Sequence, residues 1–260
     1  MSQLMSRLAS RRAQLLCAWT GPVFVIAFLI GFVPIARMLP APHPSWSGQQ
    51  VTDWYLGNLT GIRVGMVICI LAIALIGPYG AVIATRTRET ELGPPIWTYI
   101  QLGCVGCGIM DATLTPLIFS WAAYRPGEVA PDVTMSINDF GWFAFLFTFP
   151  PFTVWCLAIA GAILTNHSGR PFLPRWVAYM NVWAGLLYFP AALLLFFKRG
   201  AFAYNGLLAL YVPLAAFLIW IVLMTQQLIR SIKADMPSES SAGTPGHDAH
   251  RVLGGMHHRE

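Results

Sequence analysis

Charged side chains are scarce in this chain. Asp, Glu, Lys and Arg make up 10% of its 260 residues, whereas 56% of the residues are hydrophobic. A typical soluble domain is about 25% charged, so this composition excludes an ordinary soluble protein and indicates one whose surface is covered by lipid. The short polar stretches between the apolar runs leave no room for a separate soluble catalytic domain.

Several residue types are missing from the apolar runs. They contain no histidine, which argues against a b-type haem held between helices. They contain no deep lysine for a retinal Schiff base, and the chain has no Walker or dinucleotide-binding glycine pattern. We therefore predict no cofactor. Cys104 and Cys107 have the spacing of a redox or zinc pair, but no second pair exists, so we predict no metal site.

Disulfides are not expected either, because none of the five cysteines lies in a predicted outer loop. The net charge of +5 is spread over several loops rather than gathered in one patch. A spread of this kind argues against a nucleic-acid partner and fits a membrane topology signal better.

What the chain has in abundance is long apolar runs. A stretch of about 20 apolar residues is enough to cross a bilayer as a helix. The runs are Cys17–Leu39, Gly61–Ala84, Ile96–Ala123, Phe140–Leu164, Trp176–Phe197 and Asn205–Ile229. The sequence therefore predicts an all-α fold, a polytopic membrane bundle of six transmembrane helices. We divide it into a basic cytoplasmic leader (1–16), the transmembrane domain (17–233) and a disordered cytoplasmic tail (234–260).

A short helix is predicted between the first and second membrane helices. Ser47 and Gln50 have the spacing of a capping box. Trp54 and Tyr55 then fall on one apolar face of Ser47–Leu59, which is typical of a helix lying at the headgroup boundary.

Basic residues set the predicted orientation. Cytoplasmic loops of membrane proteins carry an excess of Lys and Arg. With both termini in the cytoplasm, the inner side holds Arg7, Arg11, Arg12, Arg86, Arg88, Arg170, Arg175, Arg230 and Lys233. The outer side then holds Arg37, Arg63, Arg125, Lys198 and Arg199. We therefore predict cytoplasmic N and C termini.

Asp111 is the residue most indicative of function. It lies near the middle of the third apolar run, and a carboxylate at that depth costs a few kcal/mol on insertion scales. We therefore expect it to face the bundle interior and to have a partner there. Helical spacing places Cys104, Gly108, Thr115 and Ile118 on the same face.

The fourth apolar run is the second candidate region. Pro150 and Pro151 should interrupt its helix at mid-span, and a broken helix at that depth is tolerated only beside protein or a cavity. The many aromatic residues around the break suit a flat apolar ligand. The predicted site has Asp111 as its catalytic candidate and these ligand-binding candidates: Thr115, Asn181, Phe149, Phe152 and Trp142.

The six-run layout resembles that of uncharacterised bacterial six-helix integral membrane proteins. The resemblance rests on Asp53-Trp54-Tyr55 before the second run and on Pro174-Arg175-Trp176 at the start of the fifth. It implies a multi-pass protein of the bacterial cytoplasmic (inner) membrane and carries no activity with it. The chain is more weakly similar to small integral-membrane terpene cyclases, which are expected to use paired intramembrane acids where this chain has one.

Three interpretations of Asp111 stay open at this point. The first is a cytoplasmic-membrane protein that binds or passes a small, largely apolar molecule, or that serves as a membrane subunit for another membrane protein. The second is an intramembrane cyclase or isomerase, in which protonated Asp111 would act as general acid. The third is a buried structural carboxylic acid bonded to Asn181 or to a backbone carbonyl. The expected partners are the lipid bilayer, a small apolar ligand and another membrane protein.

Overall fold

The computed structural model describes residues 2–166, 168–169 and 172–235, with side chains from residue 9 onward. Every regular element in these ranges is a helix. Six helical segments are long and apolar enough to cross a membrane, which confirms the predicted all-α fold with six such segments. We number them segments 1 to 6: Ala9–Ile35, Leu59–Arg88, Ile96–Ala122, Pro131–Leu164, Arg175–Leu195 and Leu207–Ala234. Nearly all of the predicted tail (234–260) lies outside the described residues.

Most segments are built from more than one helical element. Segment 1 is α1 (Ser2–Ile30) followed by the π-helical turn η1 (Gly31–Ile35). Segment 3 is the single helix α5 (Ile96–Ala122). Segment 2 consists of α3 (Leu59–Ile73) and α4 (Ile76–Arg88), and segment 4 consists of α6 (Pro131–Phe147) and α7 (Pro150–Leu164). Segment 5 is α8 (Arg175–Leu186) followed by the 3₁₀ helix η2 (Phe189–Leu195). Segment 6 is the π-helical η3 (Leu207–Tyr211) followed by α9 (Val212–Ala234).

Prolines account for most of these interruptions. A proline has no backbone N–H and its ring crowds the preceding turn, so an α-helix ends or changes its winding there. Segment 4 breaks at Thr148 and Phe149, directly before Pro150-Pro151, as the sequence predicts. Pro190 lies in η2 and Pro34 in η1, where the regular α-helical pattern stops.

Two predicted helix starts are wrong. Segment 4 begins at Pro131, in the favourable first-turn position for proline, and not near Phe140. Asn138 therefore lies buried within α6, where its Oδ1 accepts a hydrogen bond from the Tyr55 hydroxyl at 3.3 Å. At the other end of the chain, α1 already begins at Ser2, so the predicted leader continues into the first helix.

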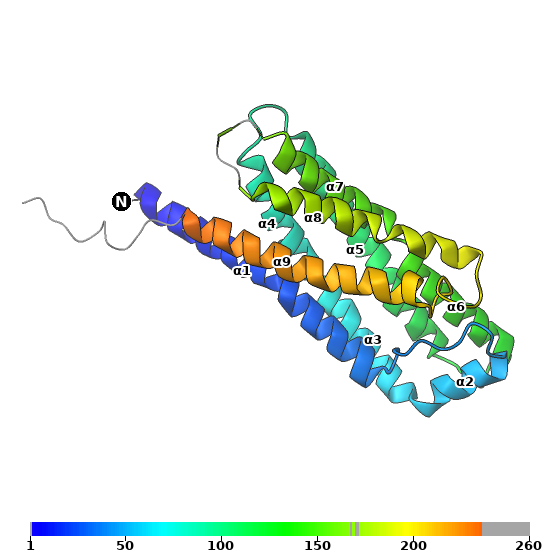
Figure 1. Ribbon diagram of the computed structural model, residues 1–260. Helices are drawn as coiled ribbons and strands as arrows, with labels where there is room; N and C mark the ends of the chain where they lie inside the picture. Colours follow the sequence, from blue (N-terminus) through cyan, green and yellow to red (C-terminus); the bar gives the residue numbers. More distant parts are fainter. Residues whose placement is uncertain (1, 167, 170–171, 236–260) are drawn as a thin grey trace, which may run out of the picture.

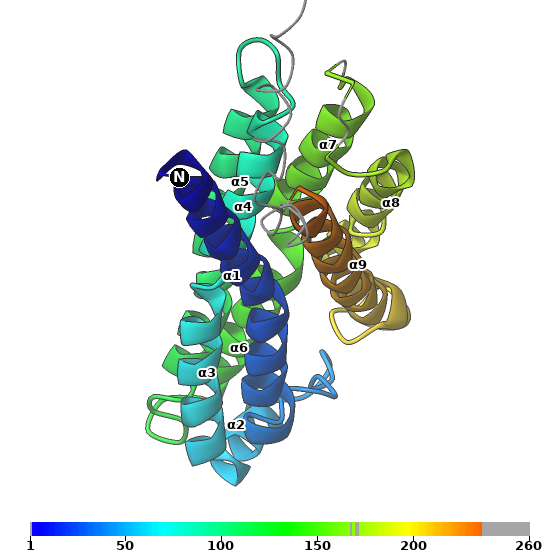
Figure 2. The same ribbon diagram turned by 90° about the vertical axis from the view of Figure 1, so that its left-hand side faces the viewer.

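The predicted helix before segment 2 is α2 (Gly48–Gly57). Its capping box is present, because Gln50 N donates to Ser47 Oγ at 3.3 Å and Ser47 N donates to Gln50 Oε1 at 2.9 Å. Val51 and Tyr55 are fully buried against the bundle. In both views α2 lies at the end of the molecule far from the N-terminus (Figure 1 and Figure 2).

The six segments form a closed ring. Each segment packs mainly against the segments before and after it in the sequence, and α9 of segment 6 packs against α1 of segment 1. These two helices run side by side along the front of the molecule in Figure 1. The start of α1 and the end of α9 therefore lie together. We refer to this end of the bundle as the terminal end and to the opposite end as the α2 end.

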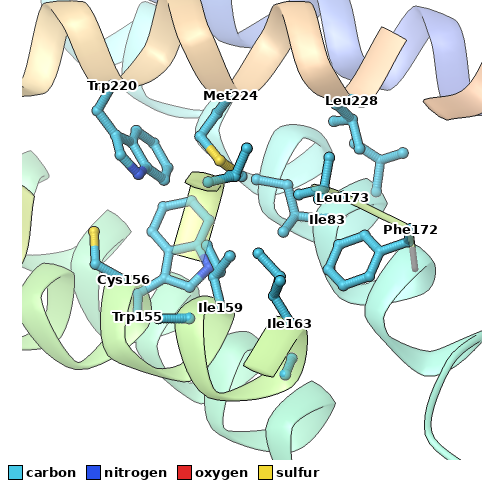
Figure 3. Packing of buried hydrophobic residues seen from close by; sticks show 14 of the residues in the cluster. Ile83, Trp155, Cys156, Ile159, Ile163, Phe172, Leu173, Trp220, Met224 and Leu228 are labelled. Atoms are coloured by element: carbon cyan, nitrogen blue, oxygen red, sulfur yellow. The ribbon is translucent and has the colours of Figure 1, made fainter. Parts of the chain in front are cut away.

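Two apolar clusters fill the ends of the ring. In the cluster toward the terminal end, side chains of α9 point toward α7 and toward Ile83 of α4 (Figure 3). The rings of Trp155 and Trp220 meet there edge to face, with centroids 5.2 Å apart. The cluster toward the α2 end is built around Trp142 and Phe119, whose centroids are 5.4 Å apart. The space between these clusters contains the candidate site.

Candidate functional site

A cavity of about 200 Å³ lies at the centre of the ring, and all six segments contribute to its wall. The wall is mainly apolar and rich in phenylalanine. The rings come from segments 1, 4 and 6: Phe24, Phe28, Phe145, Phe149, Phe152 and Phe217. The break between α6 and α7 lies on the cavity wall, because both Thr148 and Phe149 line it. Of the two surroundings expected for such a break, protein or a cavity, the structure shows a cavity.

Four of the predicted site residues come together on this wall: Asp111, Thr115, Phe149 and Phe152. Cys104 and Gly108 line the cavity too, so α5 presents the face that helical spacing predicts. Gly108 leaves free space, because a Cβ added there would meet no atom within 4 Å. Ile118, which belongs to the same predicted face, is buried and does not line the cavity.

Asn181 and Trp142 do not line the cavity. The amide of Asn181 is already bonded: its Nδ2 donates to Val177 O of its own helix at 2.8 Å, and its Oδ1 accepts from Trp220 Nε1 of α9 at 2.9 Å. Trp142 is fully buried in the cluster toward the α2 end, where its ring stacks on Tyr204 with centroids 5.6 Å apart. Both residues support the walls of the bundle from outside the cavity.

Asp111 is half-buried and has no hydrogen bond or ion pair with any other described residue. The expected partner is therefore absent among the described residues. Asn181 cannot serve, because its amide is already bonded to Trp220 and to the backbone of its own helix. The carboxyl group instead borders the cavity. An unpaired polar group in an apolar surrounding is costly, so Asp111 would gain from a partner that enters the cavity.

Tyr188 is a wall residue that the sequence analysis missed. It lines the cavity at the point where α8 gives way to η2, and its hydroxyl is buried without a hydrogen-bond partner in the described structure. The hydroxyl of Thr115 is in the same state. No sequence signal distinguishes Tyr188 from the other aromatic residues. Two unpaired hydroxyls and a carboxyl group thus share an otherwise apolar wall, which is typical of a site that orients a small ligand.

No lysine, arginine or histidine lines the cavity among the described residues. The same part of the chain contains no group of three or more His, Cys, Asp and Glu side chains placed to hold a metal ion. Cys104 borders the cavity, whereas Cys107 is exposed on the outer face of α5. The charge of Asp111, when it is ionised, is therefore not balanced by any described wall residue.

The charged groups are concentrated at the ends of the bundle. At the terminal end, Arg86 is only 3% exposed and pairs with Glu89 and with Asp235, the latter at 2.7 Å. Its NH2 group also donates to Ser231 Oγ at 2.7 Å. Arg11 pairs with the same two acids, at 3.2 Å and 3.5 Å. This network joins α1, α4 and α9, whereas the sequence identified Arg86 only as one of the basic residues of the inner side.

A second polar network lies toward the α2 end. Asp139 accepts a hydrogen bond from the Tyr204 hydroxyl at 3.3 Å and one from the Asn138 amide at 3.4 Å. Burial raises the pKa of Tyr55 well above its usual value, and burial together with the neighbouring Asp139 also raises the pKa of Tyr204. These phenols therefore stay neutral and act as hydrogen-bond donors.

Arg63 does not pair with Asp139. Its Nε donates to Ala123 O at 2.9 Å and its NH2 donates to Tyr124 O at 3.0 Å. These carbonyls lie at the C-terminal end of α5, where the helix leaves acceptors unsatisfied and carries a partial negative charge. Arg63 therefore caps segment 3 from segment 2, and Asp139 keeps its phenol and amide partners.

No protein-family model matches this chain, no curated protein matches it, and no solved structure matches it. The resemblance to bacterial six-helix integral membrane proteins and to membrane terpene cyclases stays a prediction. The cavity and the residues on its wall are the basis on which a function is assigned.

Proposed function

We propose that this chain is a multi-pass protein of the bacterial cytoplasmic membrane that binds a small, largely apolar molecule in the central cavity. The observation that carries the proposal is the cavity itself, an apolar space of about 200 Å³ bordered by one unpaired carboxyl group and two unpaired hydroxyls. Ligand sites are usually concave and apolar, with a few polar groups that fix the orientation of the ligand.

The size of the cavity limits the ligand. An apolar cavity of about 150 Å³ stays dry and binds benzene. A space of about 200 Å³ therefore suits a molecule with one ring and a short substituent.

The outer surface supports membrane insertion. On α1, large apolar side chains recur every three or four residues and are all exposed: Leu16, Trp19, Val23, Ile26 and Ile30. This spacing forms one outward face of the helix, which water would not tolerate and lipid would cover. Trp54 and Leu56 of α2 lie at one end of the bundle, which suits the headgroup boundary.

The ion pair between Arg11 and Asp235 supports a common side for the two chain ends. The terminal end carries most of the basic residues of the chain, among them Arg12, Arg88 and Lys233. By the positive-inside rule we assign this end to the cytoplasm and the α2 end to the outside.

A cavity-filling variant tests the binding site. Because Gly108 lines the cavity and has free space around it, Gly108→Phe should occupy the cavity without disturbing the ring. Gly106→Phe is the matched control, since Gly106 also has free space but lies on the exposed face of the same helix. Thermal denaturation in lipid nanodiscs, with and without tert-butylbenzene, measures binding.

The wild type and Gly106→Phe should be stabilised by tert-butylbenzene, and Gly108→Phe should not respond. Equal responses of the two variants would contradict the proposal, because the compound would then act through the lipid-facing surface. A wild type that does not respond would contradict it as well.

The second candidate function is an intramembrane cyclase or isomerase. One observation favours it: the carboxyl group of Asp111 borders the cavity without a described partner, so in its protonated form it is free to donate to a bound molecule. Under this alternative, Asp111→Asn keeps ligand binding and abolishes turnover, because an amide cannot supply the proton. A role as a membrane subunit stays a prediction without an observation of its own.

A further inference from the structure

We infer that the ligand of the central cavity is a lipophilic organic cation, a single-ring amine or quaternary ammonium compound, held by the carboxylate of Asp111 and the surrounding aromatic rings. This inference rests on the proposed function and specifies the chemical class of the bound molecule. It follows from the charge of the wall, from its aromatic composition and from its small number of oxygen atoms.

The charge of the wall points to a cation. The described titratable residues that line the cavity are Asp111, Cys104, Tyr79 and Tyr188, and none of them is basic. The Tyr79 hydroxyl is already bonded to Thr225 at 3.1 Å. An ionised carboxylate in an apolar surrounding needs a counter-charge. Since the described wall provides none, a positively charged ligand is the partner that would complete the site.

The rings of the wall suit the same ligand. The face of an aromatic ring carries partial negative charge and attracts ammonium groups within about 6 Å of its centre, most strongly where water is excluded. Phe152 and Phe217 meet edge to face with centroids 5.2 Å apart, and Phe28 lies parallel to Phe145 with centroids 6.4 Å apart. The aromatic rings of the wall therefore face the cavity in different orientations, so they can contact both the ring and the methyl groups of a compact cation.

Inorganic cations fit this wall poorly. Calcium takes six to eight oxygen ligands, and magnesium demands near-ideal octahedral oxygen coordination. The unpaired oxygen atoms of the described wall are the carboxyl group of Asp111 and the hydroxyls of Thr115 and Tyr188. Most of the coordination shell would consist of phenylalanine, which cannot replace the water of a hydrated ion. An organic cation keeps its own hydrocarbon shell and loses little on entering.

A pair of isosteric compounds separates charge from shape. Phenyltrimethylammonium and tert-butylbenzene have the same outline and differ in one atom, a positively charged nitrogen in place of a carbon. Phenyltrimethylammonium cannot lose a proton, so its charge is fixed. Binding of radiolabelled phenyltrimethylammonium is measured on the full chain in nanodiscs of zwitterionic lipid, and tert-butylbenzene binding is measured by thermal denaturation in the same nanodiscs.

The wild type should bind phenyltrimethylammonium at least tenfold more tightly than tert-butylbenzene. Asp111→Asn, which keeps size and polarity, should weaken the cation at least tenfold and leave tert-butylbenzene binding unchanged. Asp111→Glu keeps the charge and should retain cation binding, while Gly108→Phe should abolish binding of both compounds. Size-exclusion profiles and melting temperatures of the variants show that each is folded.

The outcomes distinguish the two proposals. If the wild type and Asp111→Asn bind phenyltrimethylammonium equally, or if the wild type prefers tert-butylbenzene, the cation inference is overturned while the apolar binding site stands. If neither compound binds, or if Gly108→Phe binds both as the wild type does, the cavity is not a ligand site and both proposals fail. Loss of cation binding in Asp111→Asn alone, with rescue by Asp111→Glu, supports the inference.

Discussion

Trp220 of α9 donates a hydrogen bond of 2.9 Å from its indole nitrogen to the side-chain oxygen of Asn181 on α8. Both side chains are buried, so this bond joins segments 5 and 6 inside the cluster toward the terminal end. Asn181→Leu removes the acceptor and leaves the Trp220 N–H buried without a partner. We expect it to lower the free energy of unfolding by about 1–3 kcal/mol, measured by SDS-induced unfolding in mixed micelles.

A double-mutant cycle provides the control for this bond. In Trp220→Phe the donor is absent, so adding Asn181→Leu should cost less than it does in the wild type. Equal costs in the two backgrounds would show that Asn181 contributes by packing and not through the indole.

Arg86 should be the most important charged residue at the terminal end. It is 3% exposed and pairs with Glu89 and Asp235, whose side chains are 39% and 45% exposed. Because the partners reach water, Arg86→Met should cost about 2 kcal/mol, less than breaking a fully buried pair. The neighbouring Arg88 is exposed, so Arg88→Met should change stability by less than about 0.5 kcal/mol. Similar costs for both variants would contradict the structural role of the network.

Segments 1 and 2 approach each other backbone to backbone at Gly31 and Gly65. A Cβ added at Gly31 would lie 2.7 Å from the Gly65 carbonyl oxygen, and one added at Gly65 would meet the Gly31 carbonyl oxygen. Backbone cannot move aside as a flexible side chain can, so Gly65→Ala should cost about 1–3 kcal/mol through overpacking.

The open glycine Gly103 is the matched control for this close approach, because a Cβ added there meets no atom within 4 Å. Gly103→Ala should raise stability by up to about 1 kcal/mol through helix propensity. Melting temperatures of the two variants give the comparison. A Gly65→Ala variant as stable as Gly103→Ala would show that segments 1 and 2 lie further apart.

Asp111→Leu should preserve stability or increase it slightly. From the sequence alone we expected Asp111 to have a partner inside the bundle, but the described structure gives it none. Removing a lone polar group from an apolar wall leaves no donor or acceptor behind. Thermal denaturation of the ligand-free protein checks this, and a loss above about 1 kcal/mol would mean that the carboxyl group has a protein partner.

Reporter fusions test the orientation. Fusions after Arg88, after Arg170 and at the C-terminus should report the cytoplasm, and fusions near Gly48 and Glu128 should report the outside, because the terminal end carries the excess of basic residues. Inverted signals would reverse the assignment, and the pair Lys198-Arg199 near the α2 end would then be the residues that dominate topology.

Local features of the chain could be predicted from the sequence. Hydropathy alone located the six segments, because each apolar run must be about as long as the bilayer is thick. The break before Pro150 and the capping box of Ser47 could also be predicted from the sequence, because both arise from interactions within a few residues. The cavity-facing side of α5 followed from helical periodicity around Asp111.

Relations between segments could not be predicted in this way. The partner of Asn181 comes from α9, which is 39 positions away in the sequence, and no local pattern specifies it. In the sequence, Arg86 looks like a solvent-exposed basic residue. In the structure it is buried and pairs with Asp235 at the end of α9. The fourth apolar run was predicted to begin at Phe140, but Pro131 is compatible with an earlier helix start and Tyr55 supplies a buried partner for Asn138.

The closed ring has a consequence for biogenesis. Segments 1 and 6 are the first and the last to leave the ribosome, and their contact is the one that closes the ring. Until α9 docks against α1, the cavity has no wall on that side, and Asp111 and the phenylalanines around it are open to the surroundings. The wall of the proposed binding site is therefore complete only once segment 6 has docked, so we expect a chain that lacks segment 6 to insert into the membrane but hold no ligand.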